Sequence, residues 1–422
     1  FVEESFDEVK NIPAIFDNNN EIELSYQRDE ETCSYIYEIN KTLIAQKYNI
    51  AKEYTNFKVN FISNDEELLF EVDVNIKDSE KEESEEVTDV STLSNYKNIS
   101  INYIKGKFTA DFDNKVIMGD LYYNLTAKED GNQIIFDTNE LQIIDINQII
   151  EEDTIKLNHS YGEEDENLGK PLIMNLNYTK GEYIIIRIIF NTTEKGNSVQ
   201  FLTPEQTFGK QYPYLFTQSE MILGRSLFPC QDTPSIKFKF DLEIIVPKEL
   251  RGMLSGIFVG VNNYTEVNTK GYIYKQEIPI PSYLLSIAAG NIIQKNITDN
   301  ISVFSEPEFV EEAFNETKED LPKVLELIEN YTGLPYEWGE YNILVLPRSF
   351  PFSGMENPCL SFLSPCLING DKSLVDIIFH EMIHSWSGNL VTNEVWCDFW
   401  LNEGITNFLQ RKIMGLLRND QD

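Results

Sequence analysis

Two of the three histidines in this 422-residue chain lie in one short motif, His380-Glu381-Met382-Ile383-His384. On a helix, side chains four residues apart lie one turn apart on the same face, so both imidazoles can reach one small cation. Glu381 lies between them, where it can take a proton from metal-bound water. Zinc suits these groups, because catalytic zinc is held by three protein ligands and a water molecule. The motif predicts one Zn²⁺ per chain on His380 and His384, with Glu381 as general base.

The third ligand is expected to be Glu403, which follows His384 after eighteen residues. That distance allows a loop back to an antiparallel second helix. Glu394 and Asp398 lie in between and are alternative carboxylate ligands. We prefer Glu403 because it opens a second helical pattern, where its side chain can point back at the first helix.

The alternative is that core or surface histidines fall into this spacing by chance. With so few histidines, the random expectation of H-E-x-x-H anywhere in the chain is about 0.002, so the metal interpretation is favoured. The remaining histidine, His159, lies in a polar, loop-like stretch. We expect it to be exposed to solvent.

Helical patterns begin after about residue 301, in the region that must position these residues. Residues 372–388 carry apolar side chains at helical spacing around the motif, and residues 402–417 form a second helical pattern. Residues 311–333 predict a further helix that ends at a glycine. The runs 341–347 and 359–368 predict strands.

Short apolar runs rich in Ile, Tyr and Val recur between turn signals from about residue 98 to 291, which is typical of strands. Few helical stretches interrupt them, so we expect an antiparallel sheet or sandwich domain. The clearest runs are 117–127, 133–146, 170–178, 183–190, 236–247 and 274–281.

Residues 1–91 form a distinct acidic region that ends in the run DSEKEESEEVTD, residues 78–89. Such runs are usually solvated linkers that self-repulsion extends. Residues 58–76 predict two short strands around a turn, and no motif in 1–91 indicates chemistry. The whole pattern predicts an α+β multidomain chain with domains at 1–91, 98–291 and 292–422.

The charge is strongly unbalanced, with 34 basic and 70 acidic residues and a net charge of -36. Nucleic acid and anionic membrane are excluded as main partners, because phosphate binding needs a surface rich in Lys and Arg. No apolar run is long enough to span a bilayer. Five cysteines without C-x-x-C spacing indicate free thiols in a reducing compartment, so a cytoplasmic protein is expected, although N-x-[ST] sites leave room for secretion. No feature of the sequence indicates an oligomeric state.

Several stretches around the motif match one known family. Ser353-Gly354-Met355-Glu356-Asn357 precedes HEMIH, and further support comes from FLTPEQTFGKQYPYLFTQSE, FPCQDTPSIK and FWLNEG. In these features the chain resembles the gluzincin zinc aminopeptidases, and more closely their leukotriene A-4 hydrolase/aminopeptidase branch, over about 98–422. The resemblance implies a β-rich N-terminal sheet domain followed by a thermolysin-like α/β catalytic domain.

The resemblance also implies how the substrate is bound. Glu356 is expected to bind the N-terminal ammonium of a peptide, and Gly354, Met355 and Asn357 belong to the same substrate-binding segment. Ser353 stands where the family has the first glycine of its G-x-M-E-N motif, and serine reaches positive φ only at a cost.

A second amine anchor is implied at Gln218-Ser219-Glu220, which matches the family pattern Q-x-[EQ]. Glu220 and Glu356 would pair together with a free ammonium, and an acylated amine would leave both carboxylates unpaired. Without the resemblance, Glu220 is interpreted as a solvated loop acid. Phe352 is expected to line the first side-chain pocket.

The family's catalytic domain continues past its zinc-binding glutamate, with a tyrosine that donates to the oxyanion and then a helical C-terminal domain. No tyrosine follows Glu403 in this chain, which ends at Asp422. We therefore expect an incomplete, truncated catalytic domain without an obvious oxyanion donor besides zinc.

The sequence as a whole predicts a zinc-dependent aminopeptidase that hydrolyses the N-terminal bond of peptides with a free N-terminus through a metal-activated water. One alternative is a bifunctional lipid epoxide hydrolase of the leukotriene type, which needs a long apolar pocket. Another is an inactive, truncated binding module that keeps the sheet domain and the acidic region. Glu220 favours peptides, since the leukotriene branch often has Gln at this position.

Overall fold

The computed structural model describes residues 87–418 continuously and, before residue 87, six strands. The chain divides into two compact units, Phe1–Glu86 and Val87–Asp422, which are treated separately below. The first unit contains a four-stranded sheet in the order β2-β1-β5-β6 and the antiparallel pair β3–β4. These strands are β1 (Ala14–Ile15), β2 (Glu21–Ile22), β3 (Ser25–Asp29), β4 (Ser34–Glu38), β5 (Asn56–Ile62) and β6 (Leu68–Asn75).

The two strands predicted within residues 58–76 are confirmed as β5 and β6, which pair antiparallel with Val59 opposite Val72. Most of the predicted acidic linker, residues 78–86, lies outside the described residues, and only residues 87–89 are described. Its last residue, Asp89, is not solvated: it is buried and accepts a hydrogen bond from Thr233 Oγ1 at 2.6 Å. The carboxylate has a buried donor there, so this end of the run packs onto the second unit's core.

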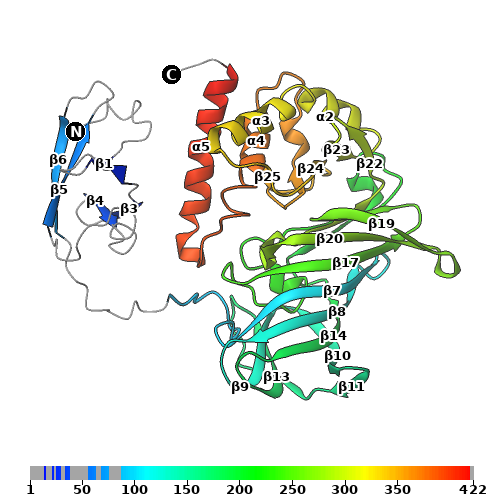
Figure 1. Ribbon diagram of the computed structural model, residues 1–422. Helices are drawn as coiled ribbons and strands as arrows, with labels where there is room; N and C mark the ends of the chain where they lie inside the picture. The colour runs from blue at the N-terminus through cyan, green and yellow to red at the C-terminus, as the bar shows by residue number, and fades with distance from the viewer. Residues whose placement is uncertain are drawn as a thin grey trace. The chain divides into compact units, whose positions relative to one another are not determined.

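An eight-stranded sheet dominates the second unit, in the order β11-β10-β14-β8-β7-β17-β20-β19 (Figure 1). Strands are present in all the apolar runs predicted between residues 98 and 291, but the run 133–146 is divided between β9 (Gly131–Thr138) and β10, which belong to different sheets. Neighbours are antiparallel, as expected for an antiparallel sheet or sandwich domain, except β17 and β7, which run parallel. Two parallel strands need a long connection between them, and here strands β8 to β16 lie between β7 and β17 in the sequence. The strands are β7 (Ile99–Asp111), β8 (Val116–Ala127), β10 (Leu141–Ile150), β11 (Asp153–Lys156), β14 (Tyr183–Thr192), β17 (Lys237–Pro247), β19 (Ile257–Tyr264) and β20 (Thr269–Pro281).

Two smaller sheets share one hydrophobic core with this sheet. Alternate side chains of β14 face that core, namely Ile184, Ile186, Ile188 and Phe190, because successive residues of a strand point to opposite faces. The smaller sheets have the orders β12-β13-β9 and β15-β16-β21-β18. Their strands are β9 (Gly131–Thr138), β12 (His159–Tyr161), β13 (Lys170–Tyr178), β15 (Val199–Leu202), β16 (Tyr214–Thr217), β18 (Arg251–Leu254) and β21 (Ile287–Gly290).

The last part of the chain forms a mixed five-stranded sheet, β22-β23-β24-β26-β25, with helices packed on it. Its three central strands are parallel and its outer pairs antiparallel. The strands are β22 (Ile293–Asn296), β23 (Ile301–Ser305), β24 (Tyr341–Val345), β25 (Gly354–Met355) and β26 (Leu360–Leu363), and the helices are α2 (Val310–Thr317), α3 (Leu321–Thr332), α4 (Val375–Ile383) and α5 (Trp400–Arg418). Short 3-10 helices lie at Pro204–Gln206, Gly224–Ser226, Thr265–Val267, Ser282–Leu284, Pro365–Leu367 and Trp396–Asp398.

The single helix predicted over 311–333 is two helices, α2 and α3. Pro322 lies in the first turn of α3, where proline is tolerated; a continuous helix would place it in the interior, where it has no amide N–H to donate and its ring clashes with the carbonyl four residues earlier, so a new helix starts here. Gly333 ends α3 with a φ of 69°, as predicted. The two strands predicted at 341–347 and 359–368 are present as β24 and β26, the second of them shorter and followed by a 3-10 turn.

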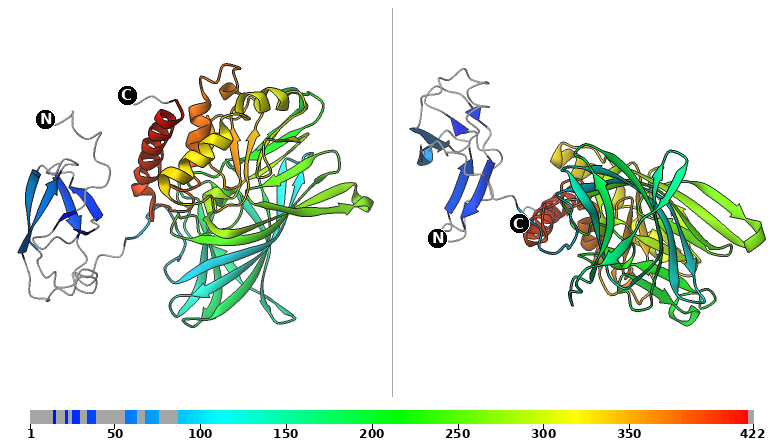
Figure 2. Two further views of the ribbon diagram at one scale, coloured as in Figure 1. Left: turned by 45° about the horizontal axis from the view of Figure 1, so that its top comes forward. Right: turned by 90° about the horizontal axis from the view of Figure 1, so that it is seen from below.

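Helices α4 and α5 lie side by side in both further views (Figure 2). Helix α4 is shorter than the predicted 372–388, and His384 follows its last residue with a helical backbone (φ -55°, ψ -21°). The His384 amide donates to the His380 carbonyl at 3.1 Å, so the predicted spacing of one turn is kept. No helix in the described ranges is long and apolar enough to cross a membrane. The cysteines of the continuous part, Cys230, Cys359, Cys366 and Cys397, are free thiols.

Candidate active site

The two motif histidines and Glu403 converge on one point between α4 and α5. Their ligand atoms all lie within 4.8 Å of one another. The two imidazole Nε2 atoms are 3.0 Å apart, and the Glu403 carboxylate lies 3.3 Å from His380 Nε2 and 3.5 Å from His384 Nε2. Two imidazoles and one carboxylate are a typical ligand set of catalytic zinc. The alternative ligands Glu394 and Asp398 do not join this cluster in the described part of the chain.

The other ring nitrogen of each histidine is held by a hydrogen bond. Gln410 uses its amide nitrogen on the Asp376 carbonyl at 2.9 Å, so its oxygen accepts from His380 Nδ1 at 3.1 Å. His384 Nδ1 donates to the Ser387 carbonyl at 2.8 Å, since a carbonyl can only accept. Each Nε2 atom therefore faces the other imidazole and the Glu403 carboxylate, and in the neutral imidazole this nitrogen carries the lone pair that can bind a cation. The donor set fits a metal ion.

Helix α5 supplies three groups to this site from one face. Glu403 provides the carboxylate, Thr406 Oγ1 lies 3.1 Å from His384 Nδ1, and Gln410 contacts His380. Residues three or four apart on a helix share a face, which explains how a single helix reaches both histidines. The orientation of the histidines thus depends on residues that the sequence motif does not contain.

The electrostatics of the site favour positive charge. Hydrogen bonds from His380 and His384 hold the pKa of Glu403 well below its ordinary value. Burial lowers the pKa of His384, but the carboxylates of Glu356, Glu403 and Glu381 outweigh burial and raise it to about 10. The site is therefore an acidic, mostly buried environment that attracts a cation.

Glu381 is buried beside this cluster, and burial followed by repulsion from Glu356 raises its pKa well above the ordinary value. Gly354 on β25 lies directly against it: a methyl group placed on Gly354 would overlap the Glu381 carboxylate. The missing side chain of Gly354 therefore provides the space that the Glu381 carboxylate occupies.

Two further carboxylates, Glu356 and Glu220, lie close enough to repel each other. Glu356 is buried, and its Oε1 atom has no hydrogen-bond partner among the described residues. Burial and then repulsion from Glu356 raise the pKa of Glu220 well above its ordinary value, so Glu220 is not the solvated loop acid of the alternative interpretation. A buried carboxylate without a donor is costly, which indicates that a ligand supplies the missing hydrogen bond.

The remaining residues expected to bind substrate adjoin these carboxylates. Gln218 and Met355 are both buried and in contact, with Gln218 Nε2 3.1 Å from Met355 Sδ. Gln218 Oε1 and Asn357 Nδ2 are buried without a partner in the described part. Phe352 is 49% exposed, with its ring 5.9 Å from that of Phe350, so one face of it is open to a ligand. His159, by contrast, is exposed as expected, although it lies on β12 instead of a loop.

Tyr283 is a site residue that the sequence motifs did not indicate. It is fully buried, its hydroxyl lies beside the Asn402 side chain, and its ring packs 5.0 Å from that of Trp396. Burial, followed by the charges of Glu356 and Glu220, raises its pKa well above the ordinary value. The influence of these two charges shows that the hydroxyl lies near the carboxylates. The sequence has 21 tyrosines, and no motif distinguishes this one from the others.

A half-buried lysine supports the loop after α4. Lys237 Nζ on β17 donates to the carbonyls of Asn389 and Leu390, both at 3.1 Å. The Asn389 side chain in turn donates to the Glu356 carbonyl at 2.7 Å, and the Asn389 amide donates to the His384 carbonyl at 3.0 Å. The eight-stranded sheet is thereby connected to both the histidine and the carboxylate sides of the site.

Comparison with known families gives two matches. A model of the peptidase M1 N-terminal domain matches residues 94–284, and a model of the peptidase family M1 domain matches residues 316–422. Among curated proteins, leucine aminopeptidase 2 of Yarrowia lipolytica is 38% identical over 333 residues, covering 79% of this chain and 50% of that protein. Leukotriene A-4 hydrolase of Xenopus laevis is 37% identical over 339 residues, covering 79% of this chain and 55% of that protein.

Solved structures agree with these matches. Yeast LTA4 hydrolase in complex with bestatin superposes with a TM-score of 0.73 at 36% identity, covering 79% of this chain and 51% of that one. The native yeast LTA4 hydrolase gives the same TM-score, 0.73, at 37% identity. The chain spans about half the length of the relatives that it matches.

Proposed function

The chain belongs to peptidase family M1, with the leukotriene A-4 hydrolase and leucine aminopeptidase 2 relatives, and we propose that its site hydrolyses the N-terminal peptide bond of peptides with one zinc ion as cofactor. The observation that carries this proposal is the convergence of His380, His384 and Glu403 beside the buried carboxylates of Glu381 and Glu356. M1 peptidases are generally zinc-dependent, and the donor set of this chain fits that metal.

His380, His384 and Glu403 would hold the zinc ion. When bound, it would polarise the scissile carbonyl and lower the pKa of a water molecule. Gln410, Ser387 and Thr406 keep the imidazoles in the orientation that this requires.

Glu381 would act as the proton carrier of the reaction. Its carboxylate would accept a proton from the attacking water and then deliver it to the nitrogen of the leaving amine. The water-poor surroundings and the neighbouring Glu356 raise the pKa of Glu381 and so make it a stronger base than an exposed glutamate. Gly354 leaves the room in which this carboxylate lies.

Glu356 and Glu220 would bind the free α-ammonium of the substrate. A cation placed between them offsets both their mutual repulsion and the missing hydrogen bond at Glu356 Oε1. A peptide with an acylated N-terminus would leave the buried Glu356 and the half-buried Glu220 unpaired, which costs several kcal/mol in comparable cases, about 2–5. The site would therefore favour exopeptidase over endopeptidase cleavage. The N-terminal residue of the substrate would lie against Met355, Asn357, Gln218 and Phe352.

The relatives include proteins named for two activities, aminopeptidase and leukotriene A-4 hydrolysis. The second carboxylate, Glu220, favours the first for this chain, because an ammonium group needs opposite charge and an epoxide does not. The free thiols of the described part also support the reducing environment of the cytoplasm as its location.

The test is hydrolysis of leucine p-nitroanilide and of its N-acetyl form by the purified, zinc-loaded chain. We expect cleavage of the free amine only, and loss of cleavage in Glu381→Gln with zinc retained. Glu337→Gln, at an exposed glutamate, is the matched control and should cleave like the wild type. Equal cleavage of the acetylated substrate, or full activity in Glu381→Gln, would contradict the proposal.

A further inference from the structure

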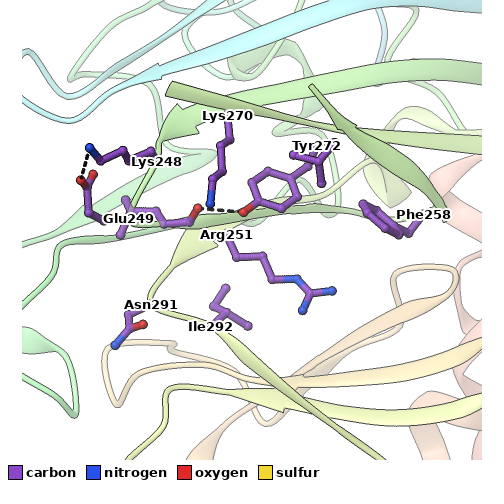
Figure 3. Close-up of a pocket in the computed structure, with 10 residues that line it drawn as sticks. Lys248, Glu249, Arg251, Phe258, Lys270, Tyr272, Asn291 and Ile292 are labelled. Carbon is purple, nitrogen blue, oxygen red and sulfur yellow. Dashed lines mark hydrogen bonds and ion pairs between the residues drawn. The ribbon is translucent and has the colours of Figure 1, made fainter. Parts of the chain in front are cut away.

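A cavity of about 370 Å³ lies between the eight-stranded sheet and the short strands that follow it, and none of its lining residues belongs to the site described above. Figure 3 shows its lining side chains, which come from the turn at residues 248–250, from β18, β19 and β20, and from residues 291–292. A cavity of this size falls within the range of small-molecule sites, roughly 300–1,000 Å³.

Strand register determines which side chains face this cavity. Lys270 and Tyr272 are two residues apart on β20 and therefore share a face of the sheet. Val261 of β19 lies opposite Tyr272. Glu243 of β17 lies opposite Ile273, the residue that follows Tyr272 on β20, so its carboxylate is on the other face of the sheet. The cavity face of β20 thus presents a cation without that neighbouring acid.

Three cations line the cavity: Lys248, Arg251 and Lys270. The only lining acid, Glu249, lies 3.8 Å from Lys248. In the described part of the chain, no carboxylate lies within 4.0 Å of Arg251 or Lys270. Two cations without an acidic partner in one cavity are unusual in a chain with a net charge of -36; on the neighbouring strands, Lys239 and Lys275 each pair with an acid.

Arg251 is held in place by apolar and neutral groups. Its guanidinium carbon lies 4.7 Å from the centre of the Phe304 ring, and Nη2 donates to Gln294 Oε1 at 3.4 Å. Its Nε atom is buried, and its side chain also contacts the neutral Tyr274 side chain. The guanidinium is therefore fixed by stacking while its charge is left without a counter-ion, an arrangement that suits a bound anion.

The rest of the lining is apolar or aromatic. Phe258 and Val261 are partly exposed, at 42% and 40%, and Ile292 is buried. The Tyr272 hydroxyl donates to the Leu250 carbonyl at 3.1 Å, so its proton is already used and its ring forms a wall. A ligand with an anionic head and an apolar body would match both parts of this lining.

We propose that this cavity binds a small organic anion, with its carboxylate or phosphate paired to Arg251 and Lys270 and its apolar part against Phe258 and Val261. The proposal is independent of the peptidase function.

The test is isothermal titration calorimetry of the full chain with 1-naphthyl phosphate, 1-naphthoate and inorganic phosphate. We expect 1-naphthyl phosphate to bind at least tenfold more tightly than inorganic phosphate, because the apolar wall contributes. The ratio of the phosphate to the carboxylate probe then identifies the preferred head group. Absence of heat from both naphthyl probes, or equal binding of inorganic phosphate, would overturn the proposal.

The double variant Arg251→Met/Lys270→Met should weaken binding of 1-naphthyl phosphate at least tenfold. The matched control is Lys239→Met/Lys275→Met, which removes the same charge from β17 and β20 at lysines that pair with Glu277 and Asp241. It should bind like the wild type, and an equal loss in this control would mean that only overall charge matters. Because Arg251 also stacks on Phe304, Lys270→Met alone is measured as well, and it should retain the wild-type melting temperature while it loses affinity.

A metal site can also bind phosphate, so the titration is repeated with Glu403→Gln. Binding that persists there and is lost in Arg251→Met/Lys270→Met supports the cavity. The opposite pattern would assign the anion to the metal cluster and refute the inference.

Discussion

Substitution of Lys237 by methionine should shift the loop that contains Asn389 but change the free energy of unfolding only slightly. The two side chains have similar length, but methionine cannot donate to the carbonyls of Asn389 and Leu390, which Lys237 Nζ contacts at 3.1 Å. Asn389 would then lose part of the support that holds its side chain on the Glu356 carbonyl.

Two opposing contributions set the effect on stability. Burial lowers the pKa of Lys237 from 10.5 to about 8, and at about 1.4 kcal/mol per pKa unit the buried charge costs roughly 3 kcal/mol. Each hydrogen bond from a charged donor contributes about 1.5–3 kcal/mol, or about 3–6 kcal/mol for the two. The contributions nearly cancel, so we expect Lys237→Met to change the free energy of unfolding by less than about 2–3 kcal/mol at pH 7.

The position of the Asn389 loop has no such compensation, because methionine can form neither of the two hydrogen bonds that Lys237 donates. A shift of the Asn389 loop displaces Glu356, the proposed ammonium anchor, and we expect KM for leucine p-nitroanilide to rise about tenfold, equivalent to about 1.4 kcal/mol. Zinc content and kcat should change less than about threefold, since the metal ligands and Glu381 keep their own contacts. The matched control is Lys239→Met on the same strand, whose lysine pairs with Glu277 at 3.9 Å.

The pH dependence gives an independent check. The folded-state pKa of Lys237, about 8, lies below its unfolded value of 10.5, so between these values the unfolded chain binds more protons. The cost of burying the charge is fully present below pH 8 and is relieved as the pH rises toward 10.5. The stability of the wild type relative to Lys237→Met should therefore increase from pH 8 to 10.5. An unchanged KM in a folded, zinc-loaded variant, or a relative stability that falls over this range, would refute the reasoning.

Three other perturbations follow from the described contacts. Gly354→Ala should lower kcat at least tenfold with zinc retained, because its methyl group would displace the Glu381 carboxylate; a variant that keeps full kcat would contradict the packing against β25. Arg225→Met should destabilise the chain by about 3–5 kcal/mol in urea denaturation, because it leaves the buried Asp232, now 2.9 Å from Arg225 Nε, without its counter-ion; a loss below about 1 kcal/mol would contradict this. Removal of the metal with a chelator should lower the melting temperature of the wild type but not that of Glu403→Gln, which scanning calorimetry can measure.

The geometry of the candidate metal centre was predictable because it depends on local periodicity. Four residues along a helix fix the relation of His380 to His384, and the shortness of the following loop brings Glu403 back on α5. The alternation of apolar residues likewise predicted the strands of the large sheet, since burial of one face requires it.

Contacts between distant segments could not be predicted in this way. Lys237 and Asn389 are 152 residues apart, and only the packing of the loop after α4 against β17 brings them together. Tyr283 is similar, because nothing in its immediate sequence distinguishes a buried tyrosine at the carboxylates from one in the core. The break between α2 and α3 is a local effect, in which a proline in the first turn of α3 outweighs a continuous apolar pattern.

The most direct test of the central claim is the zinc content of the purified chain, measured by elemental mass spectrometry on the wild type and on Glu403→Gln. The account predicts about one zinc per chain in the wild type and a large loss in the variant, because His380, His384 and Glu403 form one ligand set. A wild-type chain that binds no zinc after reconstitution, or a variant that keeps all of it, would contradict the account.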